Sequence, residues 1–490
     1  MTAAITAPAA KVGRTTHVMQ YVHQRIAARE WQPGTRLPSL RSMARHQGVS
    51  KSTVVEAYER LVANGTIRPQ AGSGFYVAGP LAPLSLAEIG PRLDRQIDPL
   101  WVARQSLDMG AQALKPGCGW LPADWMPTEA IRNALRHAAR EPATLLTDYA
   151  AALGLPALRT AIAQQLSQRG QPVDPRQILV TDSGTQAIDL LCRFLIRPGD
   201  TVLVDDPCYY NFLALLRAHQ AHIVSVPYQP DGPDMDRFHQ ALARHRPRLY
   251  ISNSGLHNPT GASLSHHKAR QILDLARAHD LILVEDDIFS AFEPAPSAHL
   301  ASLDGLNRVI QVGSFSKTLS ASLRCGYLAV RADWVDALAD LRTATTFSGA
   351  WLTQSIVSHV IQDPAWPRHI GLLRQRLAQA MSRAVPLLRQ LGLEPWHVPP
   401  GGMFLWCRLP GALDSTRLAS LGLQQGLVLA PGNVFSLSRA ATAMLRFNVS
   451  QMDDPRLPGL LTTLMDQAGH MAHTAGIAES SPFMPLPHRS

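Results

Sequence analysis

Lys317 is the side chain of this sequence best suited to covalent chemistry. It lies in the run 313–327, directly after apolar residues 309–312, which predict a short buried strand. A lysine just past a strand end can form a Schiff base with an aldehyde. Ser314 and Arg324 flank it, and a hydroxyl and a guanidinium both suit a phosphate ester. The alternative is a surface lysine in a Ser-rich loop, so the run alone gives a hypothesis.

Ser183, Gly184 and Thr185 form a second polar run, between a predicted strand at 178–181 and an apolar helix at 187–195. Backbone N–H groups at the N-terminus of a helix bind phosphate, and the two hydroxyls can add to that. An ordinary Ser or Thr N-cap explains this run nearly as well.

Four more residues follow predicted strands or lie in one: Tyr209, Asn258, Asp286 and Arg446. A buried carboxylate such as Asp286 could keep a pyridine nitrogen protonated, and that charge makes the ring an electron sink. Arg446 could hold a carboxylate through two parallel hydrogen bonds. Three of them have plainer explanations. Tyr209 could be an aromatic residue of the core, Asn258 could belong to an Asn-Pro turn, and Arg446 could be a solvated arginine on a strand.

The elements that must position these residues alternate between strands and helices from residue 107 to residue 472. The predicted strands are 178–181, 201–204, 249–252, 281–284 and 309–312. This alternation predicts an α/β domain with a mostly parallel sheet. Residues 473–490 are rich in Pro and Ser, and we expect them to be a disordered tail.

The N-terminal part has a different pattern. Apolar spacing predicts helices at 17–29, 40–47 and 50–64, followed by short strands at 67–70 and 75–77. Three helices and a hairpin make a winged helix-turn-helix domain, which we place at residues 12–79. Residues 80–106 carry several prolines and no sustained core pattern, which indicates a semi-stiff linker with room for short helical pieces.

The charge of the chain is concentrated in this N-terminal domain. The net charge is +9 over 490 residues, and residues 11–79 hold 10 Lys+Arg and 3 Asp+Glu, hence 10 − 3 = +7. Such a basic domain on a nearly neutral body predicts a polyanion partner for that domain alone.

Other classes are disfavoured by composition. The five cysteines form no C-x-x-C pair, so neither a metal site nor a disulfide framework is predicted. No apolar window is long enough for a membrane helix, and the N-terminus lacks the features of a signal peptide. We therefore expect a cytoplasmic protein with no membrane partner.

Residues 12–79 closely resemble the GntR-type winged helix, through the segments 34–41, 48–54 and 57–61. The resemblance implies binding to double-stranded operator DNA, with the second helix of the motif meeting base edges and other side chains holding phosphates. The implied DNA-binding residues are Arg36, Arg41, Ser50, Lys51, Ser52, Thr53 and, in the wing, Gly72. The alternative is a winged helix that docks onto protein.

Residues 107–467 resemble a class I aminotransferase of fold type I, as found in MocR/GabR-type regulators. The matching segments are 181–186, 205–210, 257–261, 284–287, 313–327, 400–404 and 444–448. The resemblance implies pyridoxal 5′-phosphate (PLP) as cofactor, with Lys317 as its covalent partner. The implied cofactor-binding residues are Lys317, Asp286, Asn258, Tyr209, Ser183, Gly184, Thr185, Ser314, Arg324 and Tyr149.

Within that resemblance, Asp286 would pair with the pyridine nitrogen, and Asn258 would bond the ring hydroxyl. Tyr149 would reach the phosphate of a neighbouring subunit, which implies a homodimer. Arg446 would grip the carboxylate of a substrate or effector. The sequence departs from the family at Ile288 and Phe289, where a tyrosine is usual, and this puts transamination turnover in doubt.

We therefore predict a PLP-dependent transcriptional regulator that senses an amino-acid-like effector, or PLP itself, through an aminotransferase-like domain. The alternative is an active aminotransferase that retains a DNA-binding domain. The sequence names neither the effector nor the operator, and it does not distinguish an activator from a repressor.

Overall fold

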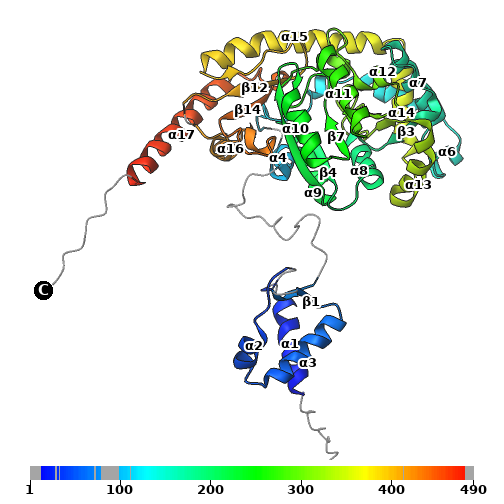
Figure 1. The fold of residues 1–490 in the computed structure, drawn as a ribbon. Helices are drawn as coiled ribbons and strands as arrows, with labels where there is room; N and C mark the ends of the chain where they lie inside the picture. The colour runs from blue at the N-terminus through cyan, green and yellow to red at the C-terminus, as the bar shows by residue number, and fades with distance from the viewer. Residues whose placement is uncertain are drawn as a thin grey trace, which may run out of the picture. The chain divides into compact units, whose positions relative to one another are not determined.

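The computed structural model describes residues 13–27, 30–31, 34–70, 73–78, 99–110, 112–411 and 413–479. Contacts divide the chain into two compact units, residues 1–95 and 96–490 (Figure 1). Each unit has its own hydrophobic core and is described by itself.

The N-terminal unit consists of three helices and a hairpin: α1 (Arg14–Ala27), α2 (Leu40–Gln47), α3 (Lys51–Ala63), β1 (Ile67–Gln70) and β2 (Gly74–Val77). The side chain of Ser39 caps α2, and Gly48 ends that helix in the left-handed conformation that glycine adopts most easily. Ser50 caps α3. The predicted winged helix-turn-helix fold is confirmed, and α1 begins three residues earlier than the apolar spacing suggests.

Tyr58 lies at the centre of this unit. It is fully buried among residues such as Val22, Met43 and Val54, and its hydroxyl donates a 2.9 Å hydrogen bond to the carbonyl of Pro38. Burial raises the pKa of Tyr58. This hydrogen bond links α3 to the turn that precedes α2, and it helps to fix the position of the two helices relative to each other.

The larger unit is built on an eight-stranded sheet in the order β3-β10-β9-β8-β7-β4-β5-β6. The strands are β3 (Ile178–Thr181), β4 (Thr201–Asp206), β5 (His222–Gln229), β6 (Gly232–Pro233), β7 (Leu249–Ser252), β8 (Ile282–Asp286), β9 (Val309–Ser314) and β10 (Gly326–Ala329). Neighbouring strands are parallel from β9 through β8, β7 and β4 to β5. Strand β10 is antiparallel to both of its neighbours, β3 and β9. The prediction of a mostly parallel sheet is confirmed.

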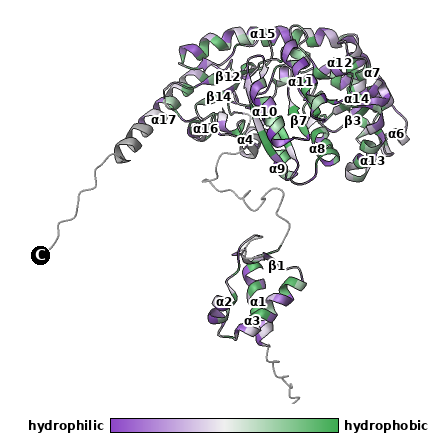
Figure 2. Ribbon diagram, in the orientation of Figure 1, coloured by the Kyte–Doolittle hydropathy of each residue, from purple (hydrophilic) through white to green (hydrophobic). Residues whose placement is uncertain are grey.

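Both faces of this sheet are buried. On β4, Leu203 belongs to one core, whereas Val202 and Val204 belong to the core on the opposite face. Successive side chains of a strand point to opposite faces, so a strand covered on both sides must be apolar throughout. The hydropathy colouring of Figure 2 shows hydrophobic residues along the central strands.

Helices cover the two faces of the sheet and complete the unit. They are α4 (Pro99–Asp108), α5 (Thr128–Ala138), α6 (Ala143–Thr147), α7 (Pro156–Gln168), α8 (Gly184–Leu195), α9 (Tyr210–Ala218), α10 (Met235–His245), α11 (His266–Ala278), α12 (Leu300–Asp304), α13 (Val335–Thr346), α14 (Trp351–Gln362), α15 (Trp366–Gln390), α16 (Ser415–Gln424) and α17 (Leu457–Glu479). In Figure 1, α15 runs along this unit from the side of α7 to the smaller sheet.

The smaller sheet is antiparallel, with the order β11-β12-β14-β13. Its strands are β11 (Glu394–Pro395), β12 (Phe404–Arg408), β13 (Ala430–Pro431) and β14 (Met444–Asn448). Short 3-10 turns occur at Ala123–Trp125, Pro175–Gln177, Ser290–Phe292, Ala332–Trp334, Gly432–Val434 and Val449–Gln451.

Two predicted segment boundaries differ from the structure. The proposed linker, 80–106, includes the first part of α4, whose residue Trp101 packs against the core around Trp406 and Phe435; residues 79–98 lie outside the described residues. The proposed tail, 473–490, includes the end of α17, which continues to Glu479. The alanines of this last segment favour helix, and the Pro-rich composition that suggested disorder begins only after it.

Candidate functional site

A pocket of about 260 Å³ lies at the carboxyl ends of the central strands. It is lined by ten of the residues singled out in the sequence: Ser183, Gly184, Thr185, Tyr209, Asn258, Asp286, Ser314, Lys317, Arg324 and Arg446. These residues come from segments spread over more than half of the chain. The structure therefore brings them together, with Tyr149 as the exception among the predicted cofactor-binding residues.

Lys317 lies in the turn that follows β9. Its Nζ makes no hydrogen bond or ion pair with any residue that the structure describes. Burial, and after it the positive charge of Arg446, lowers the pKa of Lys317 to about 8. A Cβ added at Gly119 would lie 3.9 Å from this Nζ and 4.0 Å from Nη2 of Arg446. Lys317 is thus an uncommitted amine that is easily deprotonated, the state in which an amine is nucleophilic.

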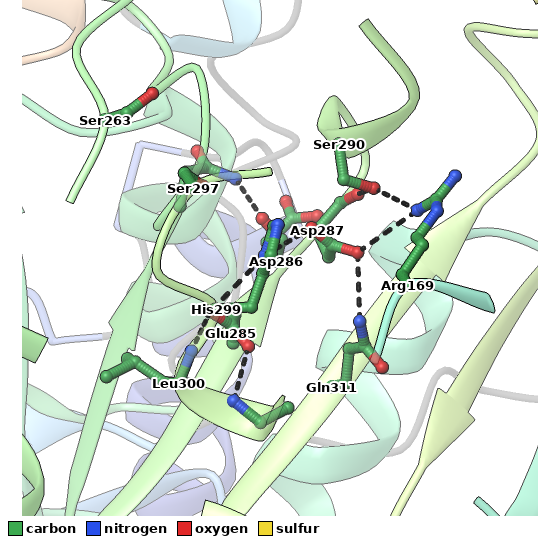
Figure 3. Close-up of polar contacts among 12 residues, drawn as sticks. Arg169, Ser263, Glu285, Asp286, Asp287, Ser290, Ser297, His299, Leu300 and Gln311 are labelled. Carbon is green, nitrogen blue, oxygen red and sulfur yellow. Dashed lines mark hydrogen bonds and ion pairs between the residues drawn. The ribbon is translucent and has the colours of Figure 1, made fainter. Parts of the chain in front are cut away.

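Asp286 is the last residue of β8 and is buried (Figure 3). Its backbone carbonyl accepts a 2.9 Å hydrogen bond from Nδ2 of Asn253, and its Oδ1 accepts a 3.3 Å bond from the backbone N–H of Ile288. Burial raises the pKa of Asp286 to about 7. A cationic partner would stabilise the ionised carboxylate of Asp286, because the positive charge offsets the free-energy cost of burying the negative charge.

Hydroxyls and backbone N–H groups from the N-terminus of α8 and from the segment after β9 also line the pocket. Ser183 caps α8, with its Oγ 3.0 Å from the N–H of Gln186, and Gly184 and Thr185 form the first turn. Oγ of Ser314 donates to the carbonyl of Cys325 at 3.2 Å. Arg324 is exposed at the rim and has a positive φ of 46°. A helix N-terminus, hydroxyls and a guanidinium together make a site for a phosphate group.

Arg446 extends from β14 and is only 2% exposed. Its guanidinium carbon lies 4.4 Å from the ring centroid of Phe404 and 4.8 Å from that of Phe435. Nη1 donates to Oδ1 of Asn258 at 2.9 Å, and Nη2 donates to the carbonyl of Gly117 at 2.6 Å, whereas the buried Nε has no partner. The guanidinium is therefore held in place, and its remaining N–H groups can still donate hydrogen bonds to an anion.

Sequence reasoning missed the segment 117–120, of which Gly119 and Trp120 line the pocket. Nδ2 of Asn448 bonds the carbonyls of Cys118 and Trp120 at 3.2 and 2.7 Å, so β14 holds this segment at two points. A Cβ at Gly117 would come within 2.5 Å of the backbone of Leu429 and Ala430, so only glycine fits there. The two glycines in the run Gly-Cys-Gly-Trp were the available signal, since a glycine often marks a close approach of the backbone.

Tyr209, Ile288 and Phe289 are further residues of the pocket lining. Tyr209 packs against Tyr210 and Phe212 at centroid distances of 4.9 and 5.4 Å. Neither the side chain of Ile288 nor that of Phe289 can donate a hydrogen bond. The two positions at which the sequence departs from the family pattern are therefore part of the pocket.

Tyr149 lies outside this pocket. It is 79% exposed, and its ring is 4.5 Å from that of Phe347, which is 55% exposed. A large exposed aromatic pair on a protein surface often marks an interaction site.

The predicted DNA-binding residues of the N-terminal unit lie around its second and third helices. Arg36, Arg41, Ser50, Lys51 and Ser52 are exposed, whereas Thr53 is half-buried. Oγ of Ser50 lies 2.8 Å from the hydroxyl oxygens of both Ser52 and Thr53. The side chains of Arg36, Arg41 and Lys51 make no ion pair within the described part of the chain. Gly72 lies outside the described residues.

The described residues include neither a membrane-spanning helix nor a metal-binding cluster. No described helix is long and apolar enough to cross a membrane. No group of three His, Cys, Asp or Glu side chains within the described ranges could hold a metal ion.

Comparison with known proteins identifies both units. A family model described as "Aminotransferase class I and II" matches residues 122–464, and one described as "Bacterial regulatory proteins, gntR family" matches residues 14–77. The chain is 28% identical to the uncharacterized HTH-type transcriptional regulator YdcR of Escherichia coli over 88% of its length and 94% of that protein. It is 24% identical to the HTH-type transcriptional regulator NorG of Staphylococcus aureus over 82% of its length and 92% of that protein.

Solved structures share the fold of the larger unit. The α-aminoadipate aminotransferase LysN of Thermus thermophilus, complexed with N-(5′-phosphopyridoxyl)-L-leucine, superposes with a TM-score of 0.69. It is 24% identical and covers 80% of this chain and 100% of its own. The kynurenine aminotransferase of Pyrococcus horikoshii superposes with a TM-score of 0.70 at 21% identity, covering 79% of this chain and 98% of its own.

Proposed function

Because the chain belongs to the aminotransferase class I and II family and carries a gntR-family helix-turn-helix domain, we propose that it is a PLP-dependent transcriptional regulator of the MocR type. In this proposal the N-terminal unit binds operator DNA, and the larger unit binds PLP and an amino-acid-like effector. The observation that carries the proposal is the single pocket that joins Lys317, Asp286, Asn258 and Arg446.

The pocket residues fit PLP chemically. The free amine of Lys317 would hold the aldehyde carbon, and the buried carboxylate of Asp286 would face the ring nitrogen. The N-terminus of α8, with Ser183, Gly184, Thr185, Ser314 and Arg324, would hold the phosphate. When bound, PLP supplies an electron sink for bonds at the carbon that bears an amino group.

Asn258 and Arg446 would position the two partners in this site. Oδ1 of Asn258 accepts from Arg446, which leaves its amide Nδ2 to donate to the ring hydroxyl. Arg446 would bind the carboxylate of the effector while Phe404 and Phe435 exclude water from its guanidinium. Low solvent access strengthens such a charged pair. An effector amine must then compete with Lys317 for the same carbon.

The signal would reach DNA through a change in the larger unit. An effector shifts the protein between two arrangements only if it binds one of them more tightly. The contacts of Arg446 and Asn448 with the segment 117–120 supply a candidate for this difference, because two residues of that segment line the pocket. A ligand carboxylate on Arg446 would alter the hydrogen bond from Nη2 to Gly117.

We also propose a homodimer. Tyr149 and Phe347 are exposed, and so are Leu145 and Leu146 of α6 and Leu352 of α14. A second copy that covered these side chains would bury apolar area and bring a second DNA-binding unit. Two linked units bind a two-part operator much more tightly than one.

A working aminotransferase is the second candidate. The complete set of Lys317, Asp286, Asn258 and Arg446 in one pocket favours it, whereas Ile288 and Phe289 disfavour it. A turnover assay over a panel of amino acids, run beside a footprint on the DNA upstream of the gene, distinguishes the two. Regulation without turnover supports the first proposal, and turnover without DNA binding supports the second.

A further inference from the structure

A second cavity, of about 550 Å³, lies behind the proposed cofactor pocket. Its walls come from α7, the segment after β8, the Lys317 turn, β10 and the start of α15. Small-molecule sites in proteins commonly have volumes of roughly 300–1,000 Å³. The cavity is therefore large enough for a ligand of its own.

The two cavities share one wall. Asp286 lines the cofactor pocket, the next residue, Asp287, lines the second cavity, and Ile288 and Ser314 line both. Neighbouring residues of an extended chain point to opposite sides, which explains the division between the two carboxylates. Phe315 and Thr318 also line the second cavity, so it touches the turn that carries Lys317 on its other side.

Two arginines, Arg169 and Arg374, and two carboxylates, Asp287 and Asp363, line the second cavity. Arg169 donates from Nη1 to Oγ of Ser290 at 2.6 Å and lies 3.8 Å from Oδ2 of Asp287. Nε of Arg374 donates to the carbonyl of Ala291 at 2.7 Å, and its other nitrogens have no partner within the described residues. Burial, and after it the charge of Arg169, lowers the pKa of Arg374. The two like charges therefore act on one another across the cavity.

The neighbouring carboxylates are already engaged by His299, as Figure 3 shows. Its Nδ1 lies 3.2 Å from Oδ1 of Asp287 and 4.0 Å from Oε1 of Glu285, and its Nε2 lies 3.0 Å from Oε2 of Glu293. Glu285 also accepts hydrogen bonds from the backbone at the start of α12. Asp287 is thus shared between His299 and Arg169, whereas Arg374 has no carboxylate within ion-pair distance among the described residues.

A hydroxyl and an apolar wall complete the cavity. Tyr327 is 8% exposed, lines the cavity, and its hydroxyl makes no hydrogen bond with any described residue. Burial, and after it the charge of Asp287, raises the pKa of Tyr327, so the hydroxyl stays protonated and can donate. Phe315, Ile361 and Trp366 line the same space. The lining thus combines cationic donors with an apolar surface.

We propose that this cavity is a second small-molecule site, which takes an organic carboxylate with an aromatic or branched apolar body. The carboxylate would lie between Arg169 and Arg374, within reach of the Tyr327 hydroxyl, and the apolar body would pack on Phe315 and Trp366. A ligand there would contact the turn of Lys317 without entering the cofactor pocket. The site is thus suited to a regulatory ligand distinct from the effector of the cofactor pocket.

The test is a calorimetric titration of full-length, PLP-loaded protein with 3-phenylpropionate and with 4-methylpentanoate. The Arg446→Met background removes carboxylate binding in the cofactor pocket, so that heat reports the second cavity. We expect one site per chain for at least one of these acids, and much weaker binding of 3-phenylpropionamide, which has no charge. Arg374→Met in this background should weaken acid binding at least about tenfold, because a charged hydrogen-bond partner is lost.

Arg368→Met is the matched control, because Arg368 is an exposed residue of the same helix that does not line the cavity. It should leave the affinity unchanged. Arg169→Met provides an independent second variant if Arg374→Met does not fold, and it should also weaken binding. Absence of binding by both acids, equal binding of the amide, or unchanged affinity in both cavity variants would overturn the proposal. None of these outcomes depends on DNA binding, so they leave the proposed function separately testable.

Discussion

Arg446 donates a hydrogen bond of 2.9 Å from Nη1 to Oδ1 of Asn258, across 188 positions of the chain. The bond joins the smaller sheet, which carries Arg446, to the loop after β7, which carries Asn258. It also fixes the Asn258 amide with its donor free. The two residues expected to hold the effector and the cofactor ring are thus one hydrogen-bonded unit.

Lys317→Ala should abolish covalent attachment of PLP. Wild-type protein loaded with PLP should absorb visible light and form an adduct that borohydride makes permanent, because Lys317 is the uncommitted amine of the pocket. Mass spectrometry after reduction and digestion should locate the adduct on Lys317. An adduct of equal yield in Lys317→Ala would show that another lysine is the anchor.

Arg446→Met should remove the spectral response to an amino-acid effector while PLP stays bound. Losing a charged hydrogen-bond partner costs about 1.5–3 kcal/mol, which is roughly tenfold to over a hundredfold in effector affinity. Titration of the cofactor absorbance measures this. Arg408→Met, on the exposed face of the neighbouring strand, is the control and should respond as wild type. An unchanged response in Arg446→Met would mean that the ligand is not held by a carboxylate.

Operator binding should fall steeply with salt, because contacts to phosphates release counterions. Arg41→Ala should weaken binding to all sequences alike, whereas Ser52→Ala should change sequence preference, if Ser52 touches bases. Arg244→Ala, an exposed arginine of α10 in the other unit, is the control. Fluorescence anisotropy with specific and scrambled duplexes measures both effects. Affinity that does not depend on salt would contradict this account.

His299→Gln should destabilise the larger unit in a pH-dependent manner. The carboxylates of Asp287 and Glu293 raise the pKa of His299 from 6.5 to about 12, against the opposing effect of burial. Because the pKa of His299 is higher in the folded protein than in the unfolded chain, protonation of His299 stabilises the fold. The full stabilisation is present below pH 6.5 and is lost as the pH rises towards 12. Removing one partner of a buried ion pair costs about 3–5 kcal/mol.

The measurement for His299→Gln is chemical denaturation of variant and wild type at several pH values. The difference in unfolding free energy should be largest near pH 6 and should shrink as the pH rises towards 10. His267→Gln, at an exposed position of α11, is the control and should show no such trend. A difference that grows with pH would show that His299 is neutral in the fold.

Phe347→Ser should weaken the homodimer, because it replaces half of the exposed aromatic pair with a polar residue. Sedimentation equilibrium measures the monomer–dimer constant. Val398→Ser replaces an apolar residue of 42% exposure elsewhere on the unit and should leave association unchanged. Wild-type protein that is monomeric at all concentrations would remove the basis for two linked DNA-binding units.

The sequence predicted those parts of the site that lie in short local motifs. Lys317 and Asn258 follow buried strands and Asp286 ends one, and the carboxyl ends of parallel strands meet at one edge of a sheet. Their convergence therefore follows from an α/β pattern alone. Arg446 was predicted only with the help of a family resemblance, since a strand arginine has no distinctive local signal.

Features that depend on tertiary contacts could not be predicted. The segment 117–120 acquires its place from Asn448 and Arg446, more than 300 positions away. Arg169 directly follows α7 and Arg374 lies in α15, and the apolar spacing of these helices says nothing of a shared cavity. Strands β5, β6 and β10 to β13 were not among the predicted strands, and the bounds of α4 were not predicted because prolines nearby suggested a linker.

The central claim is that a ligand in the cofactor pocket controls DNA binding. The most direct measurement is the affinity of full-length protein for the DNA upstream of its own gene, with and without PLP and a panel of amino acids. We predict that PLP, or PLP with at least one amino acid, changes this affinity several-fold, and that Lys317→Ala abolishes the change while still binding DNA. Equal affinity under all these conditions, together with turnover of an amino acid, would contradict the account and identify the protein as an enzyme.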